Sequence, residues 1–307
     1  MRTFFWLLLL LAFFAGSVDL QPLASTSVLY QVFIPLVSLD RDLITFTNEP
    51  TFTGYPPPGW ESLISIGVIQ ANGSGYRQLT TEPFCRSPSW YPDGTRIVYV
   101  SETGGFSIMN ADGSRKTPIL IGGDLVAGYE PDWSPSTDLI AFWDDGIHAL
   151  ELDKSILFPI PGTNPGDWNP ALSPDGTRLA HTRYVNGSRK IMIQNLDGTG
   201  KYVLPNTPGE VYQPAWSPDG EWIAFPANFD NNIDIYRIHP DGTGLEQVTD
   251  TPWPLLESQP TWAPDGNRIA YTLNNQNEST FDVYVINVDG TGLPELVSNA
   301  IDPDWSP

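Results

Sequence analysis

Short apolar runs alternate with turn residues along most of the chain, and the same order of runs and turns repeats. In "SPSWYPDGTRIVYV" (87–100) a segment ending in Trp is followed by Pro-Asp-Gly and then by the apolar run "RIVYV". The order recurs in "EPDWSPSTDLIAFW" (130–143), "NPALSPDGTRLAHT" (169–182), "QPAWSPDGEWIAFP" (213–226) and "QPTWAPDGNRIAYT" (259–272). The Trp position, occupied once by Leu, recurs every 39 to 46 residues. This period and the alternating apolar positions are typical of the blades of a β-propeller.

A second pattern completes each repeat: a short strand followed by Asp-Gly-Thr-Gly or a relative. Examples are "IMIQNLDGTG" (191–200) and "FDVYVINVDGTG" (281–292). Asp-Gly between two strands favours a tight hairpin, because Gly accepts positive φ. Each repeat is therefore expected to hold four strands, A to D. The Trp segment is strand A, and the two turns connect A to B and C to D.

The last six residues, "DPDWSP" (302–307), form a strand A with no strand B after it. A matching strand B, "DLITF" (42–46), lies near the N-terminus, followed by "LISIGVIQ" (63–70) and "RQLT" (77–80) as strands C and D. The last blade is therefore expected to be composite, with its strand A from the C-terminus. Such closure leaves a propeller with only short, protected edges. We predict an all-β, six-bladed propeller over residues 41–307.

The Pro-x-Trp-Ser-Pro-Asp-Gly and Asp-Ile-Tyr…Asp-Gly-Thr-Gly blocks resemble the WD-like, Pro-Asp repeats of TolB-type six-bladed propellers. The resemblance covers residues 41 to 307 and implies the propeller fold. TolB itself is a periplasmic protein of the Tol-Pal envelope complex and carries an α/β domain ahead of its propeller. Only about twenty residues separate the predicted signal peptide from the first repeat here, so we expect no counterpart of that domain. A related peptidase family adds a serine-hydrolase domain, which is not expected here either.

The chain carries 15 Lys and Arg against 36 Asp and Glu, a net charge of −21. Nucleic acid is an unlikely partner for so acidic a chain, because phosphate binding needs a basic surface. One cysteine, Cys85, allows no disulfide within the chain and is expected to be a small buried apolar residue.

The N-terminus, "MRTFFWLLLLLAFFAGS" (1–17), has the layout of a signal peptide, with a short basic start, an apolar stretch and small residues for cleavage. An uncleaved anchor is the alternative. Residues 18–40 are expected to be a linker. We therefore expect an exported protein, periplasmic or extracellular, with no transmembrane segment beyond this possible anchor.

The topology places the A-to-B and C-to-D turns on one face and the irregular B-to-C and D-to-A loops on the other. The irregular face is the usual binding surface of such a ring. A polar residue precedes Pro at the start of every strand A, where it is expected to line the mouth of the central channel. These rim residues are Ser87, Glu130, Asn169, Gln213, Gln259 and Asp302. They either bind what enters the channel or cap the strand ends and hold channel water.

Aromatic residues lie in the connections of the same face. Tyr129, Trp168 and Tyr212 are expected to pack between blades, whereas Trp253 in "DTPWPLLES" is the better candidate for exposure. The long loop "TNEPTFTGYPPPGWESL" (47–63) carries Tyr55 and Trp60, which either form a docking arm or belong to a passive insertion. Exposed aromatic rings beside polar groups suit a peptide or a sugar ring.

Nothing in the sequence indicates a catalytic or cofactor site. The three histidines fall in different repeats, no Gly-x-Ser-x-Gly elbow is present, and neither His-Glu-x-x-His nor paired cysteines indicate zinc. Most Asp residues occupy repeat turns, where their side chains cap the turn. We therefore expect no cofactor and no metal, although a glycosidase-type carboxylate pair stays open.

The sequence supports two functional hypotheses. The first is a non-catalytic, exported propeller, expected to be monomeric, that binds a protein or peptide at its irregular face and channel mouth. The second is a glycan-binding or polysaccharide-processing propeller that uses the same mouth, with Glu130 and Asp302 holding hydroxyls or a cation.

Overall fold

A computed structural model describes residues 42–48, 64–134, 136–229 and 232–307. They belong to one compact unit, Leu39–Pro307, and contain β-strands and turns without a helix. The predicted signal peptide (1–17), the linker (18–40), Tyr55 and Trp60 lie outside the described residues.

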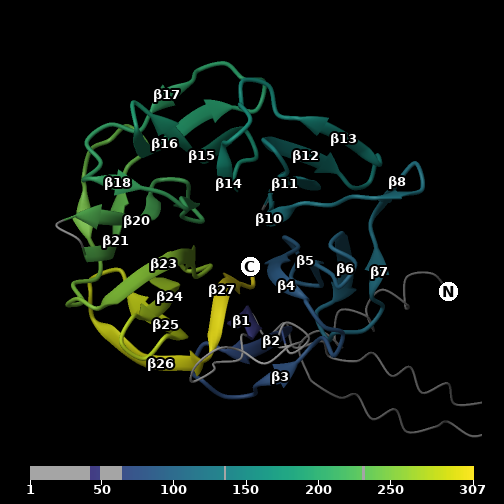
Figure 1. Ribbon diagram of the computed structural model, residues 1–307, viewed down its shortest axis with the longest axis horizontal. Helices are drawn as coiled ribbons and strands as arrows, with labels where there is room; N and C mark the ends of the chain where they lie inside the picture. The colour runs from purple at the N-terminus through teal and green to yellow at the C-terminus, as the bar shows by residue number, and fades with distance from the viewer. Residues whose placement is uncertain (1–41, 49–63, 135, 230–231) are drawn as a thin grey trace, which may run out of the picture. The chain divides into compact units, whose positions relative to one another are not determined.

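The predicted composite blade is present. The C-terminal strand β27 (Ala300–Trp305) pairs antiparallel with the N-terminal strand β1 (Leu43–Asn48), with Ile44 opposite Trp305. The sheet has the order β27-β1-β2-β3 and continues through β2 (Ser65–Gln70) to β3 (Arg77–Gln78). Figure 1 shows β27 beside β1 and the C-terminus near the centre of the ring.

Three further sheets have four strands, each in chain order. The first is β4 (Arg86–Trp90), β5 (Arg96–Val100), β6 (Phe106–Asn110) and β7 (Thr117–Pro118). The second is β10 (Tyr129–Trp133), β11 (Leu139–Trp143), β12 (Ile147–Glu151) and β13 (Ile156–Pro159). The third is β14 (Trp168–Leu172), β15 (Arg178–Val185), β16 (Ser188–Asn195) and β17 (Tyr202–Val203). A small hairpin of β8 (Leu120–Ile121) and β9 (Asp124–Leu125) lies in the connection between the first and second.

The remaining strands form one nine-stranded sheet. Its first part holds β18 (Glu210–Val211), β19 (Ala215–Trp216), β20 (Ile223–Phe229), β21 (Asn232–Ile238) and β22 (Glu246–Gln247). Its second part holds β23 (Leu255–Trp262), β24 (Arg268–Asn275), β25 (Thr280–Asn287) and β26 (Gly292–Ser298). The two parts meet at a single parallel pair, Ile233 opposite Leu256. Strand pairing thus separates four blades, and the predicted count of six depends on dividing this sheet at that pair.

The innermost strands contact one another in a circle: β4, β10, β14, β19, β23 and β27, which returns to β4 (Figure 1). Between neighbouring repeats, apolar side chains from both pack against one another. In one such cluster Ile66 and Val68 of the composite blade pack on Trp90 and Ile97 of the next repeat. Cys85, a free thiol, is buried in the same cluster, as predicted. Because each cluster draws on two repeats, no repeat can bury its apolar faces alone.

The repeat aspartates cap turns, as the sequence predicts. Asp93 Oδ1 accepts the backbone N–H of Thr95 at 2.8 Å in an A-to-B turn, and Asp197 Oδ1 accepts that of Thr199 at 2.9 Å in a C-to-D turn. The glycine that follows Asp93 has a φ of 71°, which a side chain would disfavour. These turns are short and alike, so this face offers little variation for a specific site.

Candidate functional site: the channel mouth

The six rim residues share an unusual backbone conformation. Each has a positive φ, between 46° and 54°, although none is glycine. Strand pairing shifts register beside these positions, for example between Arg86 and Ser89 and between Ser258 and Thr261. A β-bulge of this kind redirects side chains and is frequent beside functional sites. Left-handed residues other than glycine are also uncommon, and such conformations cluster where function requires them.

Hydrogen bonds join neighbouring rim residues. Asp302 receives bonds from both sides, from Ser87 Oγ at 3.2 Å and from Gln259 Nε2. Its own backbone N–H donates to Gln259 Oε1 at 3.2 Å, and the backbone N–H of Gln259 donates to Gln213 Oε1 at 3.1 Å. The side chain of one repeat thus satisfies the backbone of the next.

The chain of bonds continues on the other side of the mouth. Gln213 N–H donates to Thr182 Oγ1 at 3.2 Å, and that hydroxyl donates to Asn169 Oδ1 at 3.1 Å. Asn169 Nδ2 in turn donates to Glu130 Oε2 at 2.7 Å. The rim residues therefore cap strand ends between repeats, one of the two roles that the sequence left open. Their binding role stays a prediction.

A cavity of about 380 Å³ lies inside the ring and is lined by all six rim residues and by the strand segments that follow them. Two residues beyond the rim, three side chains each accept the backbone N–H of the next repeat's Trp position. Asp304 Oδ2 accepts from Trp90 N at 2.7 Å, Asp132 Oδ2 from Leu172 N at 2.7 Å, and Ser89 Oγ from Trp133 N at 3.2 Å. We call Ser89, Asp132, Ala171, Ala215, Thr261 and Asp304 the inner layer.

Acidic groups dominate the electrostatics of the cavity. Burial raises the pKa of both Asp132 and Asp304 to about 7. The backbone N–H of Leu172 lowers the pKa of Asp132, and the charge of Asp304 raises it. Burial also raises the pKa of Glu130, against the hydrogen bond from Asn169 that lowers it. Among the described residues that line the cavity none is Lys, Arg or His.

Sequence reasoning missed Asp132 and Asp304 as cavity residues. They are the middle residues of two Pro-x-Trp blocks, and the repeat alone presents that position as part of a structural motif. The signal was available, because residues two apart on a strand share a face. A residue two after the rim is therefore expected to face the channel as well.

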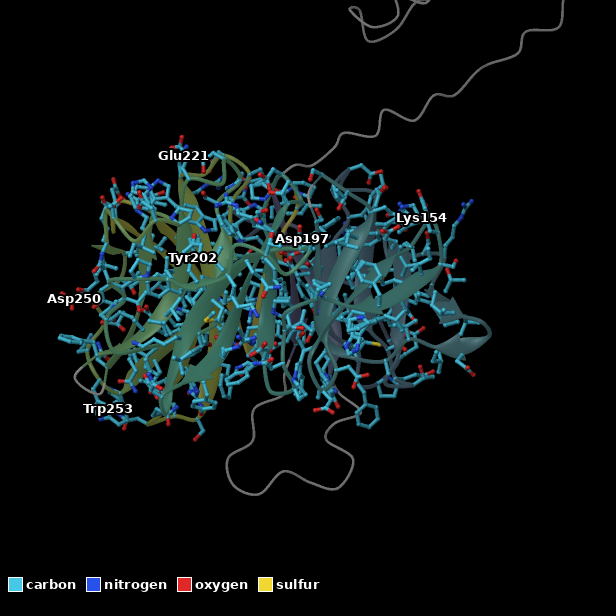
Figure 2. The ribbon with its side chains drawn as sticks, turned by 90° about the horizontal axis from the view of Figure 1, so that it is seen from above. Lys154, Asp197, Tyr202, Glu221, Asp250 and Trp253 are labelled. Atoms are coloured by element: carbon cyan, nitrogen blue, oxygen red, sulfur yellow. The ribbon has the colours of Figure 1, made fainter. Side chains whose placement is uncertain are left out.

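Aromatic residues surround the irregular face. Trp253 is 63% exposed, and Figure 2 shows it on the side of the ring opposite Glu221 and Lys154, which lie in or beside turns of the regular face. Tyr129, expected to pack between blades, is 46% exposed and contacts Trp143, with ring centroids 5.2 Å apart. Tyr129 is the first residue of β10 and its ring contacts Trp143 of the paired strand β11, so it is not buried between blades, contrary to the prediction.

The other two aromatics are half-buried. Trp168 contacts Tyr184, with centroids 5.2 Å apart, and Tyr184 is 55% exposed at the far end of β15. The guanidinium of Arg189 lies 5.8 Å from the ring centre of Tyr184 and 5.4 Å from that of Tyr212. Tyr184 and Arg189 lie on the hairpin of β15 and β16, which the sequence analysis did not single out.

The three histidines lie in different sheets: His148 on β12, His181 on β15 and His239 directly after β21. His181 is fully buried on β15, with Asp167 Oδ2 3.8 Å from its Nδ1, and neither ring nitrogen forms a hydrogen bond with a described residue. Asp167 instead pairs with Arg183 at 2.5 Å. Within the described ranges no cluster of three or more His, Cys, Asp or Glu could hold a metal ion.

Comparison with known proteins finds similarity to TolB propellers. The TolB beta propeller domain matches residues 167–307. A TolB homologue of Chlorobium luteolum is 29% identical over 135 residues, which cover 42% of this chain and 31% of that protein. The match thus spans less than a third of the relative's length.

Solved structures show the same fold at low identity. TolB from Acinetobacter baumannii superposes with a TM-score of 0.70 at 18% identity, covering 87% of this chain and 67% of the other. A TolB structure from Agrobacterium tumefaciens superposes with a TM-score of 0.61 at 20% identity, covering 83% and 88%. The described residues contain no helix long and apolar enough to cross a membrane. By its strand order and repeats the described part of the chain is a β-propeller, and these matches show that it is similar to the propellers of TolB proteins.

Proposed function

We propose that this protein is an exported, non-catalytic propeller that binds a protein or peptide at its irregular face and channel mouth. The observation that carries the proposal is the combination of an acidic central cavity with exposed aromatic side chains on the loops of the same face. Tyr, Trp and Arg are the residues most enriched where binding energy concentrates in protein interfaces.

The contacts on this face fit a docking surface. Arg86 lies over the ring of Tyr129 at 5.6 Å, and Arg189 lies between Tyr184 and Tyr212. Such pairs hold large rings in place before a partner arrives, which reduces the entropy lost on binding. The regular turns of the opposite face lack comparable variation. The irregular face is therefore the better candidate surface.

An envelope location agrees with this proposal. The signal-peptide layout of residues 1–17 supports export, and the resemblance to TolB implies a role in the cell envelope. Localisation can be checked by fractionating cells and following the full chain with a C-terminal tag.

A glycan is the second candidate ligand. The 63% exposure of Trp253 favours it, because an open indole can stack on a sugar ring. Sugar hydrolysis would additionally need two carboxyl groups on either side of one bond.

The experiment is crosslinking and affinity capture from the source organism's envelope and medium, with the full chain as bait. Tyr184→Ala and Trp253→Ala remove exposed rings from the irregular face. Tyr76→Ala is the matched control, because Tyr76 is 51% exposed beside a turn of the regular face. We expect the wild type and the control to recover the same protein. Each of the two test variants should recover at least fivefold less of it. Equal recovery by all four baits would contradict the proposed face, and enrichment of glycan without protein would support the second candidate.

A further inference from the structure

The inner layer of the channel is polar and acidic on one side and apolar on another. Asp132, Asp304 and Ser89 occupy one side, whereas the equivalent positions in two other repeats are Ala171 and Ala215. The acidic residues lie in the repeats on either side of β4, and the alanines on β14 and β19. The cavity therefore has a charged wall and a small, apolar wall at the same depth.

Each aspartate commits one oxygen to a backbone N–H of a neighbouring repeat. The Oδ2 atoms of Asp132 and Asp304 accept backbone N–H groups at 2.7 Å. Asp132 accepts no other hydrogen bond from a described residue, whereas Asp304 also accepts a long one, 3.3 Å, from Thr261 Oγ1 at its Oδ1 and a backbone hydrogen bond from Trp305. Asp132 Oδ1 thus keeps its full capacity to accept hydrogen bonds in the cavity wall, and Asp304 keeps part of its capacity.

The two carboxyl groups also lack a positive partner. No Lys, Arg or His is among the described lining residues, and the charge of Asp304 raises the pKa of Asp132, the direction expected from repulsion between like charges. Buried carboxylates are normally paired, because an isolated buried charge is costly. A cation entering from the mouth would relieve this repulsion.

We propose that the channel accepts an alkylammonium group from the partner, a lysine side chain in an extended peptide. The inference rests on the proposed function, since it describes the partner of the same site. An ammonium group is a point charge with three donors, which can reach two single oxygens on different carboxyl groups. Its aliphatic stem would lie against Ala171 and Ala215, as lysine stems commonly lie along apolar surface.

The same geometry disfavours two other cations. A guanidinium binds best to both oxygens of one carboxylate, and here each carboxylate has one oxygen already engaged. Calcium takes six to eight oxygen ligands, whereas the facing wall offers alanine methyl groups. The cavity of about 380 Å³ lies near the lower end of the range for ligand pockets, about 300–1,000 Å³, and suits one side chain.

The test is a titration of the full chain with n-butylammonium chloride at pH 8 and constant ionic strength. The readout is the amide NMR signals of Trp90 and Leu172, whose N–H groups donate to the two aspartates. We expect saturable shifts at both amides, with an apparent affinity at least tenfold higher than for tetramethylammonium, guanidinium or n-butanol.

Variants assign the effect to the carboxyl groups. Asp132→Asn and Asp304→Asn keep an oxygen that can accept the backbone N–H, and each should weaken butylammonium binding at least tenfold. Glu221→Gln removes one charge on the regular face (Figure 2) and should leave butylammonium binding unchanged. Equal binding of tetramethylammonium, a stronger response to CaCl₂, or wild-type binding by both Asn variants would each overturn the inference.

Capture experiments separate this inference from the proposed function. A partner that is lost with Tyr184→Ala and Trp253→Ala, yet retained by Asp132→Asn and Asp304→Asn, would leave the docking face standing and refute the ammonium site. A partner whose capture depends on none of these residues would refute the proposed face. Acetylating the partner's lysines should abolish capture if both proposals hold, because acetylation removes the ammonium charge.

Discussion

The carboxylate of Asp304 accepts the backbone N–H of Trp90 at 2.7 Å, although 214 residues separate the two in the chain. The bond links the last strand of the chain to the innermost strand of the next repeat. It therefore reinforces the closure that β27 and β1 provide by strand pairing.

Replacing Asp304 with Ala should destabilise the protein, whereas Asn should be tolerated. Alanine leaves the N–H of Trp90 without an acceptor, which costs about 1–3 kcal/mol for a buried donor. Asparagine keeps an oxygen in place and removes the repulsion with Asp132. Urea unfolding followed by fluorescence should show the Ala variant clearly below wild type and the Asn variant within about 1 kcal/mol of it. Two variants of equal stability would mean that this bond is not important for closure.

Asp304 also predicts a pH dependence. Burial raises the pKa of its carboxyl to about 7 in the folded protein, so the folded state holds its proton more tightly than the unfolded state. This contribution to stability is present at low pH, below the unfolded pKa near 4, and is lost as the pH rises towards 7. Wild type should therefore lose unfolding free energy relative to Asp304→Asn as the pH rises from 4 to 7. A stability difference that does not change with pH would contradict the raised pKa of Asp304.

His181 should have the opposite effect at low pH. Burial lowers its pKa to about 4, so the folded protein keeps the ring neutral while the unfolded chain becomes protonated below pH 6.5. Stability should fall as the pH drops from about 6.5 to 4. His181→Phe restores the aromatic residue that other repeats carry at this position and should weaken this fall, seen as a flatter profile of unfolding free energy against pH.

The arginine that begins a strand B supports the Trp of the next repeat. Arg178 lies 4.5 Å from the ring centre of Trp216, and Arg268 lies in the same way over Trp305. Arg178→Ala should lower the free energy of unfolding by about 0.5–2 kcal/mol, through lost cation–π attraction and lost packing. Arg178→Lys should retain part of the stabilisation that Arg178 provides. Urea denaturation measures both, and an Ala variant as stable as wild type would refute the role.

Gly128, directly before β10, lies in close contact with Phe142 of the paired strand β11. A Cβ at this position would lie 2.4 Å from a ring carbon of Phe142, which is buried. Gly128→Ala should therefore cost about 1–3 kcal/mol by overpacking. Gly104→Ala is a poor comparison because of its positive φ, so Gly292→Ala, where a Cβ meets nothing, is the matched control. Similar melting temperatures for both variants would show that the contact relaxes freely.

The sequence by itself determined the propeller, the composite blade and the role of the turn aspartates. Trp, Pro-Asp-Gly and Asp-Gly-Thr-Gly act locally, through strand alternation and turn geometry. Their structural role can therefore be predicted from the sequence alone. The tertiary structure alone decided which side chains meet: Ser87 with Asp302, Asn169 with Glu130, and Asp132 near Asp304. These residues are 39 to 215 positions apart, and only closure of the ring brings them to one channel. Spacing within a repeat can predict that Asp132 and Asp304 face the channel, but it cannot encode a contact made between repeats, so only the closed ring shows that both line the same side of the cavity.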